Sequence, residues 1–515
     1  MQGIQDFIFR TGKLREIVGA SELVEDICTK AFDEFRKEGE DVVKAAGNIK
    51  YIFFSKDACS RAALCFPKKV MGMAPGITIS QAVVELSDDY TDDEFSNAID
   101  EVEAKLKVQR NKPQKSVTLG LMGIKRANNT GLPVVEVKKK KDGVIYLDAA
   151  TSAKLSKSEF QTLCWKSFKK IEGQLAYDIS DITGQNDWIA IIHADGNGLG
   201  QVVQKVGKKK AKFREFSRLL DEATVEAANI AYDKAIKGKV GLNGVIPARP
   251  VVLSGDDMTI IIRGDLAIQY AEAFIRAFEE KTGEKLGAIL SEFGVFEEGK
   301  NCLTACAGIA FIKSSYPFYY GYQLAEDLCS QAKKDTKAIA KEGKPQKRTG
   351  KDGKPEILNY LPSSCLMFHK VQDSFITSYA DIVRRELTSK EKDHKLSFMA
   401  GPYYVNPIPV AGKHTVQELI DNSKALEGDH GEGVKSGIRN WISLRLSNKD
   451  MAEQRKNRMQ QVFYKTYSDK EAEEDNAIAR LTRETRTEFA GTETTTCMAF
   501  DVLAFNTVMN QQTNE

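Results

Sequence analysis

Three aspartates in two short segments have the side-chain type and position needed for metal chemistry. Asp195 ends an apolar run, 188–194, and a glycine-rich turn follows it directly. Asp256 and Asp257 lie in a Ser-Gly-Asp-Asp turn between two β-rich runs, which is a tight hairpin signal. An isolated Gly-Asp-Asp is more often only a solvated turn, because Gly and Asp both favour turns. If the two strands are neighbours, three carboxylates repel one another at one sheet edge, and a divalent cation resolves that repulsion.

The glycine-rich turn after Asp195 could supply the phosphate-binding half of such a site. Its backbone N–H groups are left uncovered where a helix is expected to begin, which favours bound anions. The turn comprises Gly196, Asn197, Gly198 and Gly200 around Leu199. Its spacing is not that of a Rossmann motif, since Gln201 occupies the sixth place, and no Gly-Lys-Ser/Thr follows as a P-loop requires.

Length and composition limit the alternatives. A chain of 515 residues is too long for one ordinary core, so two to four domains are expected. Lys and Arg together number 74 and Asp and Glu 72, so net charge gives no argument for nucleic-acid binding. The nine cysteines contain no Cys-x-x-Cys, which favours reduced thiols and a cytoplasmic protein. No apolar stretch approaches the roughly 20 residues of a membrane span, and the start is not typical of a signal peptide.

The elements that would position the aspartates predict an α+β fold. Residues 188–341 give the order β-α-β-turn-β-α-β-α, which is that of a ferredoxin-like domain. Residues 1–108 give the same order, with Gly3–Phe9 as a shortened first strand, strands at 41–44 and 49–54, and a fourth strand at 76–85. We therefore infer an internal duplication in which only the second copy carries the carboxylates. The predicted domains are a first ferredoxin-like copy (1–110), a linker domain with helical segments (111–187), a second ferredoxin-like copy that carries the carboxylates (188–345) and a C-terminal helical domain (346–515). The last includes a helix through Phe368-His369-Lys370.

The combined pattern resembles the palm-containing large subunit of type III CRISPR effector complexes, the cyclic-oligoadenylate polymerase subunit. The matching motifs are Gly3–Phe9 with Gly19-Ala20-Ser21, 195–200 with 254–257, 316–318 with 324–326 and 332–333, and 433–445. The resemblance covers about residues 1–450, and it implies that 1–110 is a degenerate first palm and 188–345 a catalytic second palm. Nucleotide cyclases of the GGDEF type share the same palm more distantly.

The resemblance implies roles for particular residues. Asp195, Asp256 and Asp257 would hold two divalent ions, Mg²⁺ or Mn²⁺. Lys333 would meet the outer phosphates of ATP as a point charge. The remaining nucleotide-binding residues would be Gly196, Asn197, Gly198, Leu199, Gly200, Ser254 and Gly255. The reaction would be attack of a ribose 3′-OH on the α-phosphate of ATP, giving a cyclic oligoadenylate or related signal in antiviral defence.

The chain also departs from that family's pattern. The N-terminal His-Asp nuclease domain and the zinc ribbon between the palms have no counterpart here, and Asn197 stands where many members carry a second acid. Two other functions remain open. One is a catalytically inactive palm scaffold that binds RNA or partner subunits, and the other is a dinucleotide cyclase that uses GTP.

Overall fold

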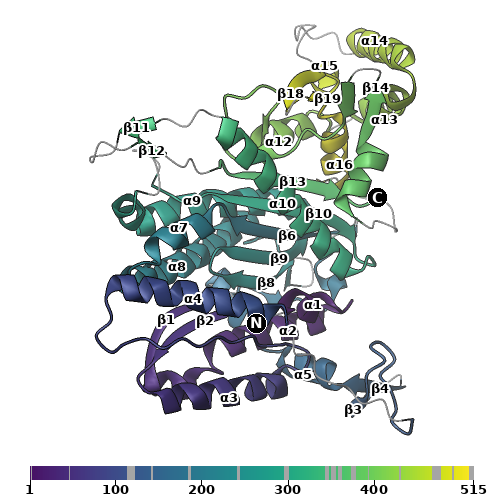
Figure 1. Cartoon of the computed structure of the whole chain (residues 1–515). Helices are drawn as coiled ribbons and strands as arrows, with labels where there is room; N and C mark the ends of the chain where they lie inside the picture. The colour runs from purple at the N-terminus through teal and green to yellow at the C-terminus, as the bar shows by residue number, and fades with distance from the viewer. Residues whose placement is uncertain are drawn as a thin grey trace.

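A seven-stranded sheet runs through the middle of the molecule, with residues 1–110 on one side and the C-terminal region on the other (Figure 1). The computed structural model describes all residues except 2, 46, 113–121, 141–142, 184–186, 241–243, 295–300, 343–346, 350–354, 358–361, 373–377, 392–393, 428–430, 467–476, 490–491 and 510–515. No helix in the described part of the chain is both long enough and apolar enough to cross a membrane.

The second palm forms the ferredoxin-like domain that the sequence predicted. Four strands lie in the order β10-β6-β9-β8, with every neighbouring pair antiparallel. The two crossover helices, α8 and α9, pack against each other and cover one face of the sheet. Its elements are β6 (Trp188–Gly196), α7 (Leu199–Val206), α8 (Lys210–Ala235), β8 (Ala248–Ser254), β9 (Asp257–Arg263), η3 (Gly264–Leu266), α9 (Ala267–Glu292), β10 (Ala305–Lys313) and α10 (Phe318–Glu342).

The central strand β6 is buried on both faces, which explains its continuous apolar sequence. Ala190 and Ile192 pack into the core beneath α8 and α9, whereas Ile189 and Ile191 pack into a second core on the other face. That second core contains α10 and the first helices of the chain. Alternate side chains of a strand point to opposite faces, so one strand supplies both cores.

The sheet continues past β10 with strand β13 (Cys365–Lys370), which pairs parallel to it, and then with β16 (Tyr403–Tyr404) and β17 (His414–Thr415). The prediction of a helix through Phe368-His369-Lys370 was therefore wrong. The run Cys365–His369 is buried throughout, and a short apolar run does not by its periodicity distinguish a buried strand from a helix.

Residues 1–110, called here the first lobe, contain a two-stranded hairpin flanked by helices. The predicted hairpin is confirmed as strands β1 (Gly39–Ala45) and β2 (Asn48–Phe53), and the predicted helices are α2 (Leu14–Thr29), α3 (Lys56–Met73) and α4 (Asp92–Arg110), with η1 (Asp33–Glu38) before β1. Two strand predictions were wrong. Residues 4–9 form the short helix α1 (Ile4–Phe9). In the predicted strand 76–85, Thr78 forms an isolated bridge, but 79–85 pairs with no strand of the described residues.

Residues 4–9 form a helix and not the expected strand, and their apolar side chains have neighbours on two sides. Phe7, Ile8 and Phe9 are all buried, and the helix packs against α2 and α10. The Phe9 ring stacks on Tyr322 of α10 with a centroid distance of 4.0 Å. Tertiary packing thus decides the conformation of a segment too short for its periodicity to do so.

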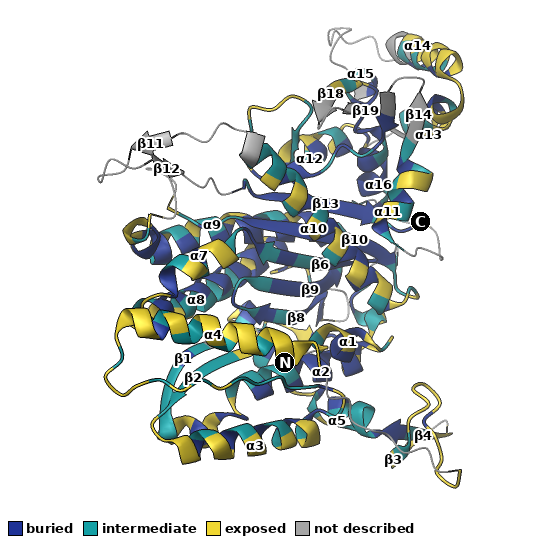
Figure 2. Ribbon diagram, in the orientation of Figure 1, coloured by how far each residue is buried: buried dark blue, intermediate teal, exposed yellow. Residues whose placement is uncertain are grey.

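The remaining regions mix helices and strands. The linker contains β3 (Val134–Lys140), β4 (Gly143–Asp148), α5 (Ala149–Lys157), α6 (Thr162–Phe168), β5 (Gln174–Leu175) and η2 (Ile179–Asp181), and β5 pairs with β7 (Val245–Ile246). The C-terminal region contains β11 (Lys347–Thr349), β12 (Pro355–Ile357), α11 (Tyr379–Ile382), η4 (Val383–Leu387), β14 (Thr388–Glu391), β15 (His394–Ser397), α12 (Val416–Lys424), α13 (Gly431–Ser447), α14 (Lys449–Thr466), α15 (Ala477–Leu481), β18 (Thr485–Phe489), β19 (Thr492–Thr496) and α16 (Ala499–Met509). Apart from the helix expected at 368–370, the predicted helices of this region are present, and β14, β15, β19 and β18 form a sheet beside them, which the sequence did not predict. Figure 2 shows burial concentrated in the central sheet and the helices around it, and exposure along α4 and α14.

Candidate functional site

The three predicted carboxylates meet at one end of the palm sheet. Asp195 lies near the end of β6, Asp256 lies in the β8–β9 turn, and Asp257 begins β9. Strands β6 and β9 are antiparallel, with Ala194 opposite Met258, so the end of one adjoins the start of the other. Each carboxylate places one oxygen within 4.8 Å of the others. The expectation that these residues lie side by side is confirmed.

The conformation of the β8–β9 turn depends on Gly255 and on hydrogen bonds from α8. Ser254 pairs with Asp257, which leaves Gly255 and Asp256 as a two-residue loop. Gly255 has a φ of 65°, the left-handed backbone that a tight hairpin needs at its first central position. From α8, the Asp221 carboxylate accepts a hydrogen bond from the Gly255 N–H at 3.3 Å, and the Thr224 hydroxyl donates to its carbonyl at 2.5 Å. These bonds fix the direction in which Asp256 points.

Gly196, the residue after Asp195, leaves room for Asp256. A Cβ atom added at Gly196 would lie 2.9 Å from Asp256 Oδ2 and 3.0 Å from Asp256 Cβ. A side chain here would push the second carboxylate away from the first. The glycine is therefore required by close approach of the two acidic segments, a reason that the sequence reasoning did not identify.

Lys333 of α10 lies in the same cluster and pairs with Asp195. Its ammonium donates to the Asp195 carboxylate and, at 2.8 Å, to the carbonyl oxygen of Gly196. The Lys333 side chain is largely buried, with 16% exposed. In this arrangement the lysine serves as counter-ion for one aspartate.

The pKa values of the three aspartates are shifted in different directions. Burial favours the neutral form of Asp195, but the Lys333 ammonium outweighs it and keeps the pKa of Asp195 below its ordinary value. Burial and the neighbouring carboxylates raise the pKa of Asp257 to about 7. Burial and the charges of Asp257 and Asp195 raise the pKa of Asp256 well above its usual range. Lys333 therefore balances Asp195, and no ion pair to Asp256 or Asp257 is present among the residues that the structure describes.

This donor set fits a hard divalent cation. Carboxylate oxygens are the ligands that Mg²⁺ and Mn²⁺ prefer, and a cation close to them would favour their ionised forms. Among the described residues, these three aspartates are the one group of acidic, His or Cys side chains near enough together to share an ion. Asp195, Asp256 and Asp257 are thus the residues that could hold the predicted metal.

The glycine turn matches the predicted phosphate cradle only in part. The Asn197 N–H donates to the carbonyl of Thr304 at 2.8 Å. The Asn197 side chain is buried; it donates to Thr304 Oγ1 at 3.1 Å and accepts a hydrogen bond from Cys306 at 3.3 Å. Asn197 therefore fastens the turn to β10 and its preceding residue. The N–H groups of Gly198, Leu199 and Gly200 open α7, where helix geometry leaves them without intrahelical acceptors.

Two further groups near the aspartates were not predicted as site residues. Glu326 of α10 accepts a hydrogen bond from Gln5 Nε2 of α1 at 3.3 Å, and burial raises its pKa. His193 of β6 contacts the Thr259 hydroxyl at 3.1 Å, and burial lowers its pKa to about 4, which keeps it neutral. His193 thus has the structural role expected of a lone strand histidine. The contact of Gln5 with Glu326 brings α1 to the edge of the site, which no spacing within the sequence indicated.

A ferredoxin-like sheet with acidic residues at the end of its first strand and in its central hairpin defines a palm domain of the nucleotidyl-cyclase and polymerase type. Residues 188–340 match a family model described as the second palm domain of Cas10/Cmr2. This part of the chain is therefore similar to the second palm domain of that family, the family to which the sequence resemblance pointed. No curated protein sequence matches the chain.

Several solved structures are similar to the chain, all at low sequence identity. A Csm1-Csm4 cassette in complex with cA3 is 13% identical, with a TM-score of 0.49, over 99% of this chain and 69% of that one. Cassettes in complex with cA4 and with pppApA are each 16% identical, with TM-scores of 0.39 and 0.42. In both, the match covers 65% of this chain and 52% of the other, so the chain spans about half the length of these relatives.

Proposed function

We propose that the chain is a metal-dependent nucleotidyltransferase that makes a cyclic oligoadenylate, or a related cyclic nucleotide signal, from ATP in CRISPR-type antiviral defence. The observation that carries the proposal is the convergence of Asp195, Asp256 and Asp257 in a palm domain of the Cas10/Cmr2 family. Two of these carboxylates have raised pKa values, which is the electrostatic state of a cation site before its cation arrives.

The three aspartates would hold Mg²⁺ or Mn²⁺. When bound, such ions lower the pKa of a ribose hydroxyl and neutralise charge on the transferred phosphoryl group. The chain's own residues have positioning tasks. The hairpin fixes Asp256 and Asp257, the bonds of Asn197 hold the glycine turn still, and the first N–H groups of α7 face the place where phosphate oxygens would lie. Lys333 would exchange Asp195 for an outer phosphate of the nucleotide.

Incubation of the purified protein with α-³²P-labelled ATP and Mg²⁺ or Mn²⁺ tests the proposal directly. We expect pyrophosphate release and a phosphatase-resistant product, both abolished in Asp256→Asn and Asp257→Asn. Asp233→Asn is the matched control, because Asp233 is an exposed carboxylate on α8 of the same palm. Parallel reactions with GTP, CTP and UTP identify the base. A failure of every nucleotide to react under both metals, with or without added target RNA and partner subunits, would falsify the proposal.

The alternative is an inactive palm scaffold that binds RNA or other effector subunits. The ion pair between Lys333 and Asp195 favours the scaffold, because it partly neutralises the carboxylate cluster without a metal. A scaffold predicts that Mn²⁺ leaves the melting temperature unchanged. It also predicts that RNA or subunit binding is the same in Asp256→Asn as in the unmodified protein. The enzyme predicts Mn²⁺-dependent stabilisation that Asp256→Asn removes.

A further inference from the structure

The hairpin that carries Asp256 and Asp257 lies at an edge of the seven-stranded sheet. Strand β8 is the outermost strand on this side, so among the described strands the hairpin is paired to the rest of the sheet only through β9 and β6. Metal ligands must be held to within a fraction of an ångström to share one ion. Contacts from elements outside the sheet therefore decide how precisely the two carboxylates are placed.

Lys166 of α6, in the linker, supplies such contacts to the back of the hairpin. Its ammonium donates to the Leu253 carbonyl of β8 at 2.8 Å and to Asp221 Oδ1 of α8 at 3.3 Å. The same Asp221 oxygen accepts the hydrogen bond from the Gly255 N–H, at 3.3 Å. One lysine thus contacts the hairpin directly at Leu253 and, through Asp221, at the residue before Asp256.

Lys166 is itself fixed from two sides. Its side chain is 20% exposed, and its ammonium lies 3.8 Å from the carboxylate of Glu25 on α2. Its backbone carbonyl accepts a hydrogen bond from Asn229 Nδ2 of α8 at 3.3 Å. Near the start of α6, the Leu163 N–H donates to Glu22 of α2 at 3.1 Å. The palm and the first lobe therefore both hold the helix that presents this lysine.

The two lysines of this region contact different parts of the site. Lys333 pairs with a predicted metal ligand, Asp195. Lys166 contacts a backbone carbonyl and two carboxylates, Glu25 and Asp221, that are not members of the group of three aspartates. The first lysine thus balances the charge of a ligand, whereas the second determines where the hairpin lies.

We propose that Lys166, acting with Asp221, is a positioning residue for the metal-binding hairpin, so that the linker sets the geometry of the carboxylate site. The inference rests on the proposed function, since it concerns the same three aspartates. The action of the lysine is indirect: it fixes the Leu253 carbonyl and the acceptor of the Gly255 N–H, and through them the approach of Asp256 to Asp195.

Positioning and simple charge predict opposite effects when the lysine is removed. A nearby positive charge repels a cation, so loss of that charge alone would tighten Mn²⁺ binding. In Lys166→Met we instead expect Mn²⁺ affinity and kcat each to fall by about ten-fold, because displaced carboxylates no longer share one ion. Lys166→Arg keeps both the charge and the hydrogen-bond donors, and it should recover most of the affinity.

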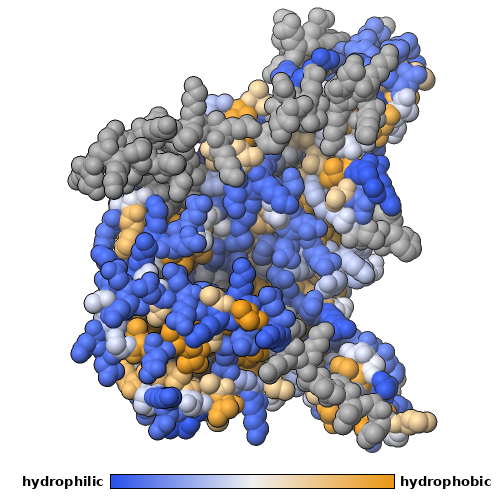
Figure 3. All heavy atoms as spheres, in the orientation of Figure 1, coloured by the Kyte–Doolittle hydropathy of each residue, from blue (hydrophilic) through white to orange (hydrophobic). Residues whose placement is uncertain are grey.

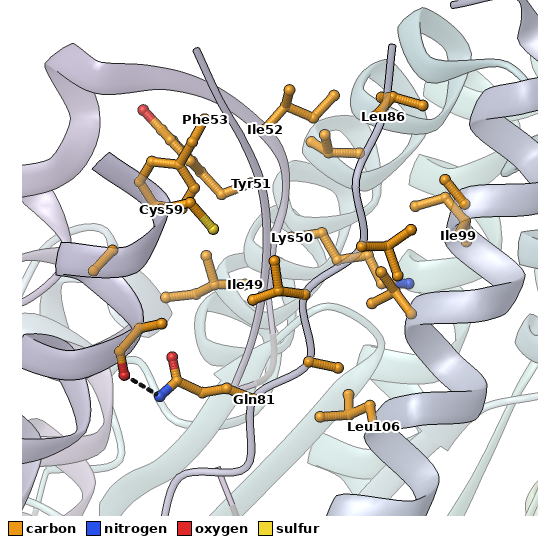
Figure 4. A pocket seen from close by; sticks show the side chains of 18 of the residues that line it. Ile49, Lys50, Tyr51, Ile52, Phe53, Cys59, Gln81, Leu86, Ile99 and Leu106 are labelled. Carbon is orange, nitrogen blue, oxygen red and sulfur yellow. Dashed lines mark hydrogen bonds between the residues drawn. The ribbon is translucent and has the colours of Figure 1, made fainter. Parts of the chain in front are cut away.

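Lys50 of β2 provides the matched control. Its side chain is 19% exposed, and its ammonium pairs with Glu103 at 2.6 Å. Figure 3 shows apolar side chains gathered on the surface of the first lobe, and Ile49 and Ile99 line a cavity of this lobe together with Lys50 (Figure 4). Methionine suits such surroundings. Lys50→Met should therefore leave Mn²⁺ affinity unchanged, although the same charge is lost from an equally exposed lysine.

Hydrogen exchange of the hairpin amides, 253–257, in the metal-free protein tests the inference without the reaction. We expect exchange about ten-fold faster in Lys166→Met and in Asp221→Ala, and unchanged in Lys50→Met. If Lys166→Met does not fold, Lys166→Gln, which keeps a donor without the charge, takes its place with the same expected direction.

This measurement also separates the inference from the proposed function. Exchange that depends on Lys166 in a protein that neither binds Mn²⁺ nor turns over a nucleotide would support the positioning role and reject the enzyme. Unchanged exchange in Lys166→Met, with unchanged or tighter Mn²⁺ binding, overturns the positioning role. An equal loss of affinity in Lys50→Met overturns it as well.

Discussion

Asp256 and Asp257 have raised pKa values, and each must lose its proton before it can bind a metal. Because the pKa of Asp257 is raised to about 7, this carboxyl group is largely protonated at pH 6 and largely ionised at pH 8. A cation needs the ionised form, so it competes with the proton at the lower pH. Metal affinity should therefore rise as pH passes through 7.

For Asp257 alone, the expected gain in Mn²⁺ affinity between pH 6 and pH 8 is about ten-fold, since each pH unit below the pKa costs up to a factor of ten. Calorimetric titration or the electron paramagnetic resonance signal of free Mn²⁺ measures it. In Asp257→Asn the affinity should be weaker at both values and the pH dependence smaller. An affinity that is equal at pH 6 and pH 8 in the unmodified protein contradicts the assignment of Asp257 as a ligand.

The side-chain N–H donor of Asn197 determines that this residue stabilises the glycine turn. Its side-chain amide donates to Thr304 Oγ1, whose own proton is donated to the Pro362 carbonyl at 2.5 Å. An aspartate at 197 would place a buried carboxylate against an oxygen with no proton to offer. We expect Asn197→Asp to destabilise the protein by about 1–3 kcal/mol and not to increase metal affinity.

Thermal unfolding and Mn²⁺ titration of Asn197→Asp check both parts of this expectation. Asn197→Ser keeps a donor and provides the comparison. Tighter Mn²⁺ binding by the aspartate variant would show that the side chain at 197 can turn toward the carboxylates, against its position in the structure.

At the scale of elements, the approach of β6 to the β8–β9 hairpin depends on a glycine at 196. In Gly196→Ala the new methyl group would meet Asp256, so either the hairpin or the end of β6 must shift. We expect Mn²⁺ affinity and nucleotide turnover each to fall by about ten-fold or more, because metal ligands tolerate little displacement. Gly72→Ala is the control, since Gly72 lies outside the site and a Cβ there has nothing within 4 Å. Equal behaviour of the two variants would count against the close approach.

Some elements of this fold could be predicted from the sequence and others could not. The second palm was predictable because its long strands and helices have clear periods and its carboxylates follow strand ends. Segments 4–9 and 365–370 were assigned wrongly, since each is a short apolar run whose conformation is decided by neighbours distant in the chain. The partners of Asn197 lie on a segment more than a hundred residues away, and no local pattern contains them. Lys333 was singled out only through the family resemblance, and the structure places it beside Asp195.

At the scale of the molecule, helix α1 joins the first lobe to the palm. Phe9 is 1% exposed, and its ring stacks on Tyr322 of α10 beside the site. Phe9→Ala should cost about 3–5 kcal/mol, the usual loss for a buried phenylalanine. We expect the first lobe to become sensitive to protease in this variant before the palm does. Gln5→Ala, which removes only the bond to Glu326, should retain the protease resistance of the unmodified chain.

Neighbouring residues of β6 belong to opposite cores: Ile191 faces the first lobe and α10, and Ile192 faces α8, α9 and the C-terminal helices. A single isoleucine-labelled sample for methyl NMR thus contains two reporters, one for each half of the molecule. Events on the first-lobe side would move one resonance and events on the C-terminal side the other. A metal or nucleotide at the end of this same strand should move both.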